Sequence, residues 1–151
     1  MSEQDIKDRV LRAFADWAVY SANWVGEKYG EDAVQEYFRY ILTSLGNRLF
    51  QLEGREILKA LQTLNNNLGS GTAYEEDDER AVLTVQCNTG GRAEREGKSL
   101  SGPGGVPYYC MHCKIHLEDM ARERGKPMTM QYAPEGKGCK FIYEKKVLTG
   151  K

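Results

Sequence analysis

The chain has no long hydrophobic run, no marked excess of either charge, and few cysteines or histidines. No apolar stretch approaches the ~20 residues needed to cross a bilayer, so we expect no membrane partner. The net charge of −1 at pH 7 gives no electrostatic reason to expect nucleic acid as a partner. Residues 1–5 are acidic and lack the cationic and apolar regions of a secretory signal. These absences predict a cytoplasmic protein.

The rest of the composition is that of an ordinary globular chain. The 151 residues are 40% hydrophobic and 28% charged, which suits one domain with a single core. No internal repeat of solenoid length is present. We expect a single domain over 1–151, in which a helical half (1–70) precedes a cysteine-containing α+β half (80–146).

The first half has the apolar period of helices. Apolar residues recur at helical spacing over 5–28, about 32–49 and 57–68, and each series predicts a helix with one inward face. The aromatic members are expected in the core, with a ligand pocket as the alternative. The acidic run 75–79 predicts a solvated loop, because like charges repel. The residues predicted to face inward are Ile6, Val10, Phe14, Trp17, Trp24 and Val25, then Val34, Phe38, Ile41, Leu42, Leu45 and Leu49, then Ile57, Leu58, Leu61, Leu64 and Leu68.

The second half has the period of strands. β-Branched or apolar runs at 81–87, 127–133 and 139–144 predict strands, and 110–124 predicts one helix. The glycine-rich connection 88–109 is long enough to be functional, and we expect a mobile lid there. The predicted fold is therefore α+β, with N-terminal helices packed on a small antiparallel sheet that one further helix covers.

The four cysteines are Cys87, Cys110, Cys113 and Cys139. In a reducing compartment they are better explained as ligands or catalysts than as disulfides, with unlinked buried thiols as a further alternative. The C-x-x-C pair lies on one side of the predicted helix, and the predicted hairpin and strand pairing bring the other two cysteines to the same end of the sheet. Four thiolates suit zinc, with an iron–sulfur cluster as the alternative.

Two histidines and two arginines are the other candidate site residues. His112 and His116 are candidate catalytic groups or metal ligands, with half-exposed helix positions as the alternative. Arg92 and Arg95 are candidates to bind a substrate carboxylate. Alternatively, they balance neighbouring glutamates on a solvated loop.

The cysteine-containing half resembles the 4-vinyl reductase domain and the related L-2-amino-thiazoline-4-carboxylic acid hydrolase family. The resemblance covers roughly 80–145 and depends on three segments: Pro107-Tyr108-Tyr109-Cys110 at a helix start, the Gly125-Lys126 break, and Gly136-Lys137-Gly138-Cys139-Lys140-Phe141 before a strand. The helical first half and the cysteine that ends a strand, Cys87, resemble the hydrolase branch. Zinc-binding 4-vinyl reductase domains place Glu and Cys just before the final cysteine, where this chain has Gln131 and Ala133. The resemblance therefore carries over only Cys110 and Cys139 as ligand candidates.

This resemblance implies a 4-vinyl reductase-like fold and a small-molecule hydrolase. The reaction expected is cleavage of a C–N or C–S bond in a carboxylated heterocycle, with a thiolate-bound metal. The alternatives are a ligand-binding or sensor module with a structural four-cysteine zinc site, and a small iron–sulfur protein. The expected partners are a small-molecule ligand or substrate and, as an option, a second copy of the chain in a homodimer.

Overall fold

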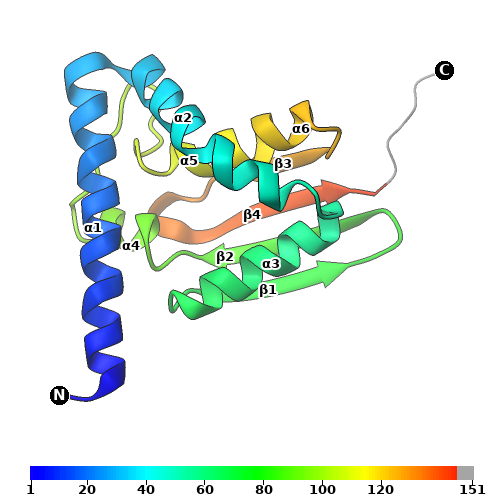
Figure 1. Ribbon diagram of the computed structural model, residues 1–151, viewed down its shortest axis with the longest axis horizontal. Coiled ribbons are helices and arrows are strands. Elements are labelled where there is room, and N and C mark those ends of the chain that lie inside the picture. Colours follow the sequence, from blue (N-terminus) through cyan, green and yellow to red (C-terminus); the bar gives the residue numbers. More distant parts are fainter. Residues whose placement is uncertain (146–151) are drawn as a thin grey trace.

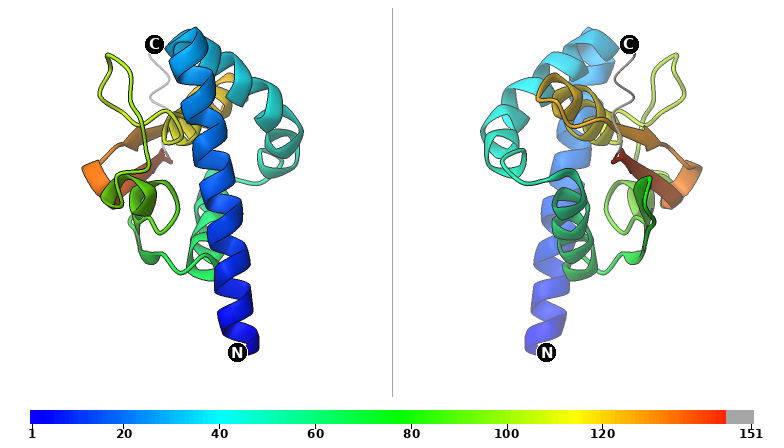
Figure 2. Two further views of the ribbon diagram at one scale, coloured as in Figure 1. Left: turned by 90° about the vertical axis from the view of Figure 1, so that its left-hand side faces the viewer. Right: turned by 90° about the vertical axis from the view of Figure 1, so that its right-hand side faces the viewer.

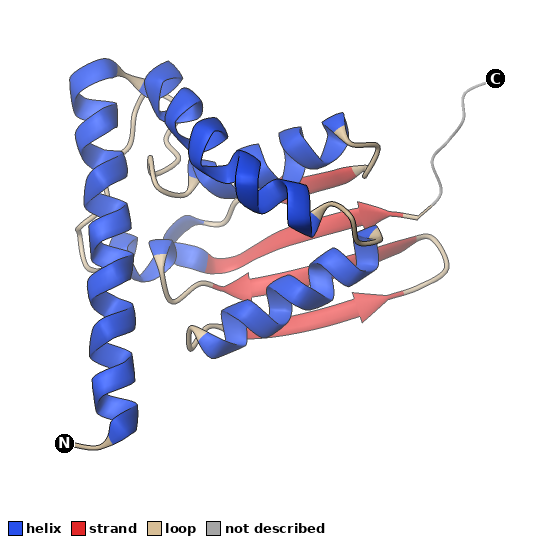
Figure 3. Ribbon diagram, in the orientation of Figure 1, coloured by secondary structure: helices blue, strands red, loops and turns tan. Residues whose placement is uncertain are grey.

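Helices and a four-stranded antiparallel sheet make up the protein (Figures 1 and 3), which confirms the predicted α+β class. The computed structural model describes residues 1–145, apart from the side chains of residues 44–47. The helices are α1 (Glu3–Tyr29), α2 (Glu31–Leu49), α3 (Gly54–Asn67), α4 (Gly90–Arg95), α5 (Met111–Lys114), η1 (Ile115–Met120), α6 (Ala121–Glu123) and η2 (Pro134–Gly136). The strands are β1 (Gly71–Glu76), β2 (Arg80–Gln86), β3 (Met128–Gln131) and β4 (Lys137–Glu144).

The first helix has clear start and stop signals. The Ser2 hydroxyl accepts a hydrogen bond from the backbone N–H of Asp5 at 3.1 Å, and the Asp5 carboxylate accepts one from the backbone N–H of Ser2. This capping box satisfies two of the free donors at the helix start. The helix ends at Gly30, whose φ of +87° is a backbone conformation that only glycine adopts freely.

The sheet has the strand order β1-β2-β4-β3, with every neighbouring pair antiparallel. The predicted pairing of 81–87 with 139–144 is confirmed, because β2 and β4 pair with Val85 opposite Cys139. Strand β1 was not predicted from the sequence. Glu75 and Glu76, predicted to lie in a loop, are exposed residues at the end of this edge strand, where charge discourages pairing with another chain.

The helices form a layer over one face of the sheet. Helix α3 packs on β1, β2 and β4, while α5 and η1 pack beside it on β3. Helix α2 lies over α5 and η1, and α1 stands at one end of the sheet against α2 and α4 (Figure 2). One buried cluster joins both halves of the chain, with Phe38, Ile57, Leu83, Ile115 and Phe141 among its members. Within residues 1–145, no helix has the length and apolarity needed to cross a membrane.

The predicted inward face of α1 is wrong except at Val25, which is partly buried against the core. Ile6, Val10, Phe14, Trp17 and Trp24 are between 48% and 68% exposed, and the helix packs instead through a face with small residues. A Cβ on Gly26 would lie 2.4 Å from the Tyr108 ring, so only glycine permits this close packing. On the later helices, Val34, Phe38, Leu42, Ile57 and Leu58 are buried as predicted, whereas Ile41 and Leu64 are exposed. Leu45 lies outside the described side chains.

The connection 88–109 has secondary structure of its own and hydrogen bonds to the first two helices. It contains α4, and it is fixed to α1 by Asn23, whose side-chain amide donates to Lys98 O at 2.7 Å and accepts from the backbone N–H of Leu100 at 3.0 Å. Gly104 N–H also donates to the Glu31 carboxylate. Side chains of α1 and α2 thus contact the backbone of this connection, and its mobility as a lid stays a prediction.

Candidate thiol cavity

All four cysteines line one cavity of about 630 Å³ between the helices and the sheet. We call it the thiol cavity. Its apolar wall comes from α2, α3, η1 and the sheet, and consists mainly of Leu42, Leu49, Leu52, Leu61, Leu64, Leu68, Val85, Leu117, Met130 and Phe141. Its polar end contains the four cysteines with Thr89, Tyr109, His112, His116 and Tyr132. The sequence-based expectation that the cysteines lie at one end of the sheet thus agrees with their placement around one volume.

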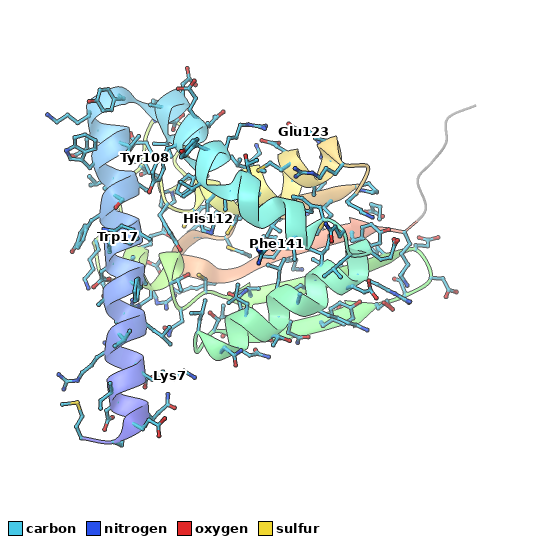
Figure 4. The ribbon with its side chains drawn as sticks, viewed as in Figure 1. Lys7, Trp17, Tyr108, His112, Glu123 and Phe141 are labelled. Atoms are coloured by element: carbon cyan, nitrogen blue, oxygen red, sulfur yellow. The ribbon has the colours of Figure 1, made fainter. Side chains whose placement is uncertain are left out.

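His112 and Cys113 form a hydrogen-bonded pair at this end. His112 Nδ1 contacts the carbonyl oxygen of Tyr109, and its Nε2 lies 3.4 Å from Cys113 Sγ. A carbonyl oxygen only accepts, so Nδ1 carries the proton of the neutral ring and Nε2 offers its lone pair to the thiol. The ring is held between Tyr109 and Phe38, at centroid distances of 4.5 Å and 5.5 Å. Figure 4 shows His112 on the side of its helix that faces the sheet.

Burial keeps this pair uncharged. It lowers the pKa of His112 from its ordinary value, because desolvation disfavours the imidazolium ion. Burial also raises the pKa of Cys113 well above its usual range, and negative charge on Cys110, Cys87 or Cys139 would raise it further. A neutral thiol beside a neutral imidazole is an acid–base pair that becomes ionic only when a ligand or metal supplies compensating charge.

The other three thiols are held by short local contacts. Cys87 Sγ lies 3.0 Å from the hydroxyl of Thr89. Cys139 Sγ accepts a hydrogen bond from the backbone N–H of Ala133 at 3.2 Å, which partly offsets the rise in its pKa caused by burial. Cys110 packs against Gly90, where an added Cβ would lie 3.0 Å from its sulfur. Burial raises the pKa of Cys110 far above its ordinary value.

His116 lies one helical turn after His112, in η1. Its ring packs on Phe50 at a centroid distance of 5.2 Å, and its Nε2 is buried without a hydrogen-bond partner among the described residues. Burial, with smaller effects from His112 and Arg124, lowers the pKa of His116 to about 4. The wider π-helical turn of η1 is of the kind often found at functional sites, and it places His116 on the cavity wall.

Arg92 and Arg95 do not line the thiol cavity. The buried guanidinium of Arg92 pairs with Asp16 at 3.7 Å. Arg95 donates to the carbonyl oxygens of Glu135 and Cys87, the latter at 3.3 Å. Their contacts indicate that they hold α4 in place, and their role in binding a substrate carboxylate stays a prediction. Of the charged side chains described, Arg48 is the one that lines the cavity.

Three residues of the site were not predicted. Thr89 and Tyr109 line the cavity beside the cysteines, and Tyr132 lines it from the end of β3. The hydroxyl of Tyr132 donates to both carboxylate oxygens of Glu94, at 2.7 Å and 2.9 Å. Thr89 lies two residues after Cys87, and Tyr109 directly precedes Cys110. This closeness to a cysteine was the one feature of the sequence that could have identified them as site residues.

The thiols as placed do not form a metal site. Throughout the described part of the chain, no three His, Cys, Asp or Glu side chains are close enough together to hold a metal ion. The donor chemistry suits zinc, but four sulfurs bind one ion only when each lies about 2.3 Å from it. Side-chain rotation and loss of the thiol protons would both be required.

Comparisons with protein-family models, with curated proteins and with solved structures found no match to this chain. The fold and the cavity thus define an α+β protein with a thiol-lined apolar site.

Proposed function

We propose that the protein binds a small, mainly apolar molecule in the thiol cavity, with the polar part of the ligand beside Cys113 and His112. The observation that carries this proposal is the lining: mainly apolar side chains, together with all four thiols and both histidines, line one cavity. The volume of about 630 Å³ lies within the usual range for small-molecule sites, about 300–1,000 Å³.

The lining restricts the chemistry of the ligand. Leucines on α2 and α3 face the apolar body, which suits an aromatic or alicyclic ring. Described lining residues include no carboxylate, and the cation Arg48 is exposed. A ligand carboxylate would therefore be placed at the open side near Arg48, because burying it elsewhere would leave it unpaired.

A thiol-dependent hydrolase is the second candidate, and the contact between Cys113 Sγ and His112 Nε2 favours it. In this candidate reaction Cys113 is the nucleophile, His112 is its base, and the Tyr109 carbonyl orients the base. As Cys113 sulfur bonds to an electrophilic C=N carbon, its proton passes to His112 Nε2. The C=N π electrons move to this nitrogen, which takes the proton from the imidazolium. The lone pair of the second amidine nitrogen then expels it as an amine, so that the C–N bond breaks and a thioimidate remains on Cys113. Water adds to the thioimidate carbon, and departure of the Cys113 thiol leaves the amide product. His112 is better placed than His116 for this role.

The predicted zinc or iron–sulfur centre remains a third proposal. The shared cavity of the four cysteines supports it, and so does the N–H···S bond of Cys139, since backbone donors stabilise thiolates. Bound metal would replace the thiol protons and cross-link β2, the start of α5 and β4. This centre would be compatible with either a sensor or an enzyme. The 4-vinyl reductase-like fold likewise remains a proposal that follows from the resemblance.

Titration with 1-aminoanthracene, an apolar fluorescent probe, tests the binding proposal. We expect saturable binding of one probe per chain to the wild type, and loss of binding in Leu61→Trp, where the indole fills the cavity. Leu100→Trp is the matched control, because Leu100 is 40% exposed and does not line the cavity. Equal binding by both variants and the wild type would contradict the proposed site.

A further inference from the structure

One face of α1 carries large apolar side chains that the rest of the described chain leaves uncovered. They recur at three- and four-residue spacing and are between 48% and 68% exposed; we call them the α1 stripe: Ile6, Val10, Phe14, Trp17, Tyr20 and Trp24. Figure 4 shows Trp17 on the side of α1 that points away from the sheet, and Figure 1 shows that the N-terminal end of the helix extends beyond the sheet.

The α1 stripe is not needed to attach the helix to the body. The buried positions of α1 are Val19, Ala22, Asn23 and Gly26, which lie on the opposite side of the helix at 100° per residue. Gly26 meets the Tyr108 ring, and Asn23 bonds the segment 98–100. The inner face of α1 is thus packed against and hydrogen-bonded to the rest of the chain, and its apolar outer face is a separate surface.

The area of the α1 stripe is that of an interface. At the observed exposure, each aromatic member presents on the order of 100–150 Å² to solvent. One stripe then exposes about 700 Å², more than the largest patch of a typical monomer. Two stripes facing each other would remove at most about 1,400 Å² from water, which reaches the lower part of the range of stable protein interfaces.

The charges of α1 favour another protein surface over an anionic membrane. The helix contains four cations (Lys7, Arg9, Arg12 and Lys28) and five acids (Glu3, Asp5, Asp8, Asp16 and Glu27), so its net charge is 4 − 5 = −1. Helices that lie on anionic membranes are rich in Lys and Arg on the polar face, and α1 has no such excess.

We propose that the α1 stripe is the interface of a homodimer in which two α1 helices pair antiparallel. With Trp17 at the two-fold axis, Phe14 lies opposite Tyr20 of the second copy and Val10 lies opposite its Trp24. Arg9 and Glu27 are about five full turns apart, so they lie on the same flank of the helix. In an antiparallel pair the same flanks meet, and Arg9 of each copy therefore faces Glu27 of the other. A parallel pair would not bring these opposite charges together.

Sedimentation velocity across a concentration series tests this proposal. The wild type should be a dimer, and Trp17→Glu should raise the dimer Kd by about 30-fold or more, because it places a charge at the centre of the apolar contact. Tyr40→Glu is the matched control: Tyr40 is an exposed aromatic residue of α2, 84% exposed and off the stripe, and its replacement should leave Kd unchanged. Arg9→Glu should weaken the dimer, and the double variant Arg9→Glu/Glu27→Arg should restore it.

Three results would overturn the proposal. They are a monomeric wild type at about 100 µM, a dimer whose Kd is the same in Trp17→Glu, and a monomer that co-sediments with phosphatidylcholine–phosphatidylglycerol vesicles. Since Trp17 is exposed in the monomer, Trp17→Glu should melt at the temperature of wild type diluted below its dimer Kd, because dimerisation itself raises Tm. This comparison separates loss of the interface from loss of the fold. Binding of 1-aminoanthracene should also persist in this variant, so the dimer and the thiol cavity are tested separately.

Discussion

Gly91 is a position where one added methyl group should separate α4 from the turn η2. A Cβ at Gly91 would lie 2.5 Å from the Cα of Gly136 and 2.9 Å from the carbonyl oxygen of Glu135. These neighbours are backbone atoms and cannot rotate away. Both glycines line the thiol cavity, and Cys87 N–H donates to Gly136 O at 2.9 Å. Gly91→Ala should therefore disturb both the fold and the position of Cys87.

The size of the effect follows from two opposing contributions. Overpacking costs typically 1–3 kcal/mol, and backbone neighbours place this case near about 3 kcal/mol. Alanine returns up to about 1 kcal/mol because it favours the helix more than glycine does. We expect Gly91→Ala to lower the free energy of unfolding by about 2 kcal/mol in urea, with a fall in Tm of about 4–8 °C. Alkylation of Cys87 and Cys110 by iodoacetamide should also become faster.

Gly97→Ala is the control for backbone strain. Gly97 has a φ of +70° but no atom within 4 Å of an added Cβ, so alanine should cost about 1 kcal/mol through the left-handed conformation alone. Its thiol alkylation rates should match the wild type. Wild-type stability and wild-type thiol rates in Gly91→Ala would refute the close packing of α4 on η2.

Three further predictions concern pH, metal and the connection 88–109. The pKa of His116 is about 4 in the folded protein, below its value of about 6.5 in the unfolded chain. Between these pH values the imidazole is protonated in the unfolded chain but not in the folded protein. The free energy of unfolding should therefore fall as pH drops from 6.5 to 4. Because this side chain is only partly buried, we expect about 1–2 kcal/mol rather than the full linkage value, and His116→Gln should flatten the pH curve. If the four thiols bind zinc or an iron–sulfur cluster, elemental analysis of anaerobically purified protein should give a stoichiometric metal. The Cys139→Ser variant should lose this metal and part of its thermal stability. Wild-type protein without metal, together with a wild-type Tm in Cys139→Ser, would count against the centre. Limited proteolysis should cut 88–109 slowly in the wild type and faster in Asn23→Ala, which removes the side-chain hydrogen bonds to the backbone of Lys98 and Leu100. Equal cutting rates would mean that these hydrogen bonds do not hold the segment.

The helices and the sheet order around the cysteines could largely be predicted from the sequence. Apolar periodicity gave α2 and α3 to within a few residues, and β-branched runs gave β2 and β4. Their antiparallel pairing places Cys87 and Cys139 at the same end of the sheet. The apolar patterns of these helices and strands predict them well because the side chains that form each pattern are buried in the core of the same chain.

Two errors show where such patterns fail. Periodicity identifies an apolar face, but it does not say what covers that face. In α1 the large residues point outward, while Ala22 and Gly26 face inward because small residues allow close packing against Tyr108. Strand β1 was missed because its acidic end resembles a loop; pairing with β2, a non-local interaction, makes it a strand.

The site residues show the same limit. The cysteines were identified from residue type and spacing, whereas Arg92 and Arg95 were assigned to the cavity on charge alone. Arg92 is buried beside Asp16 of α1, a contact across more than seventy residues that no local pattern contains. The preference for His112 over His116 likewise depends on a short contact with Cys113, which helical spacing does not resolve.

The most direct test of the thiol cavity is peptide-resolved alkylation of the four cysteines with iodoacetamide, with and without saturating 1-aminoanthracene. If the probe occupies the cavity, it should slow the modification of Cys87, Cys110, Cys113 and Cys139 together, because all four line the same volume. Denatured protein provides the fully reactive reference. Saturable binding of the probe that leaves all four rates unchanged would show that the ligand binds elsewhere, and would contradict the thiol cavity as the functional site.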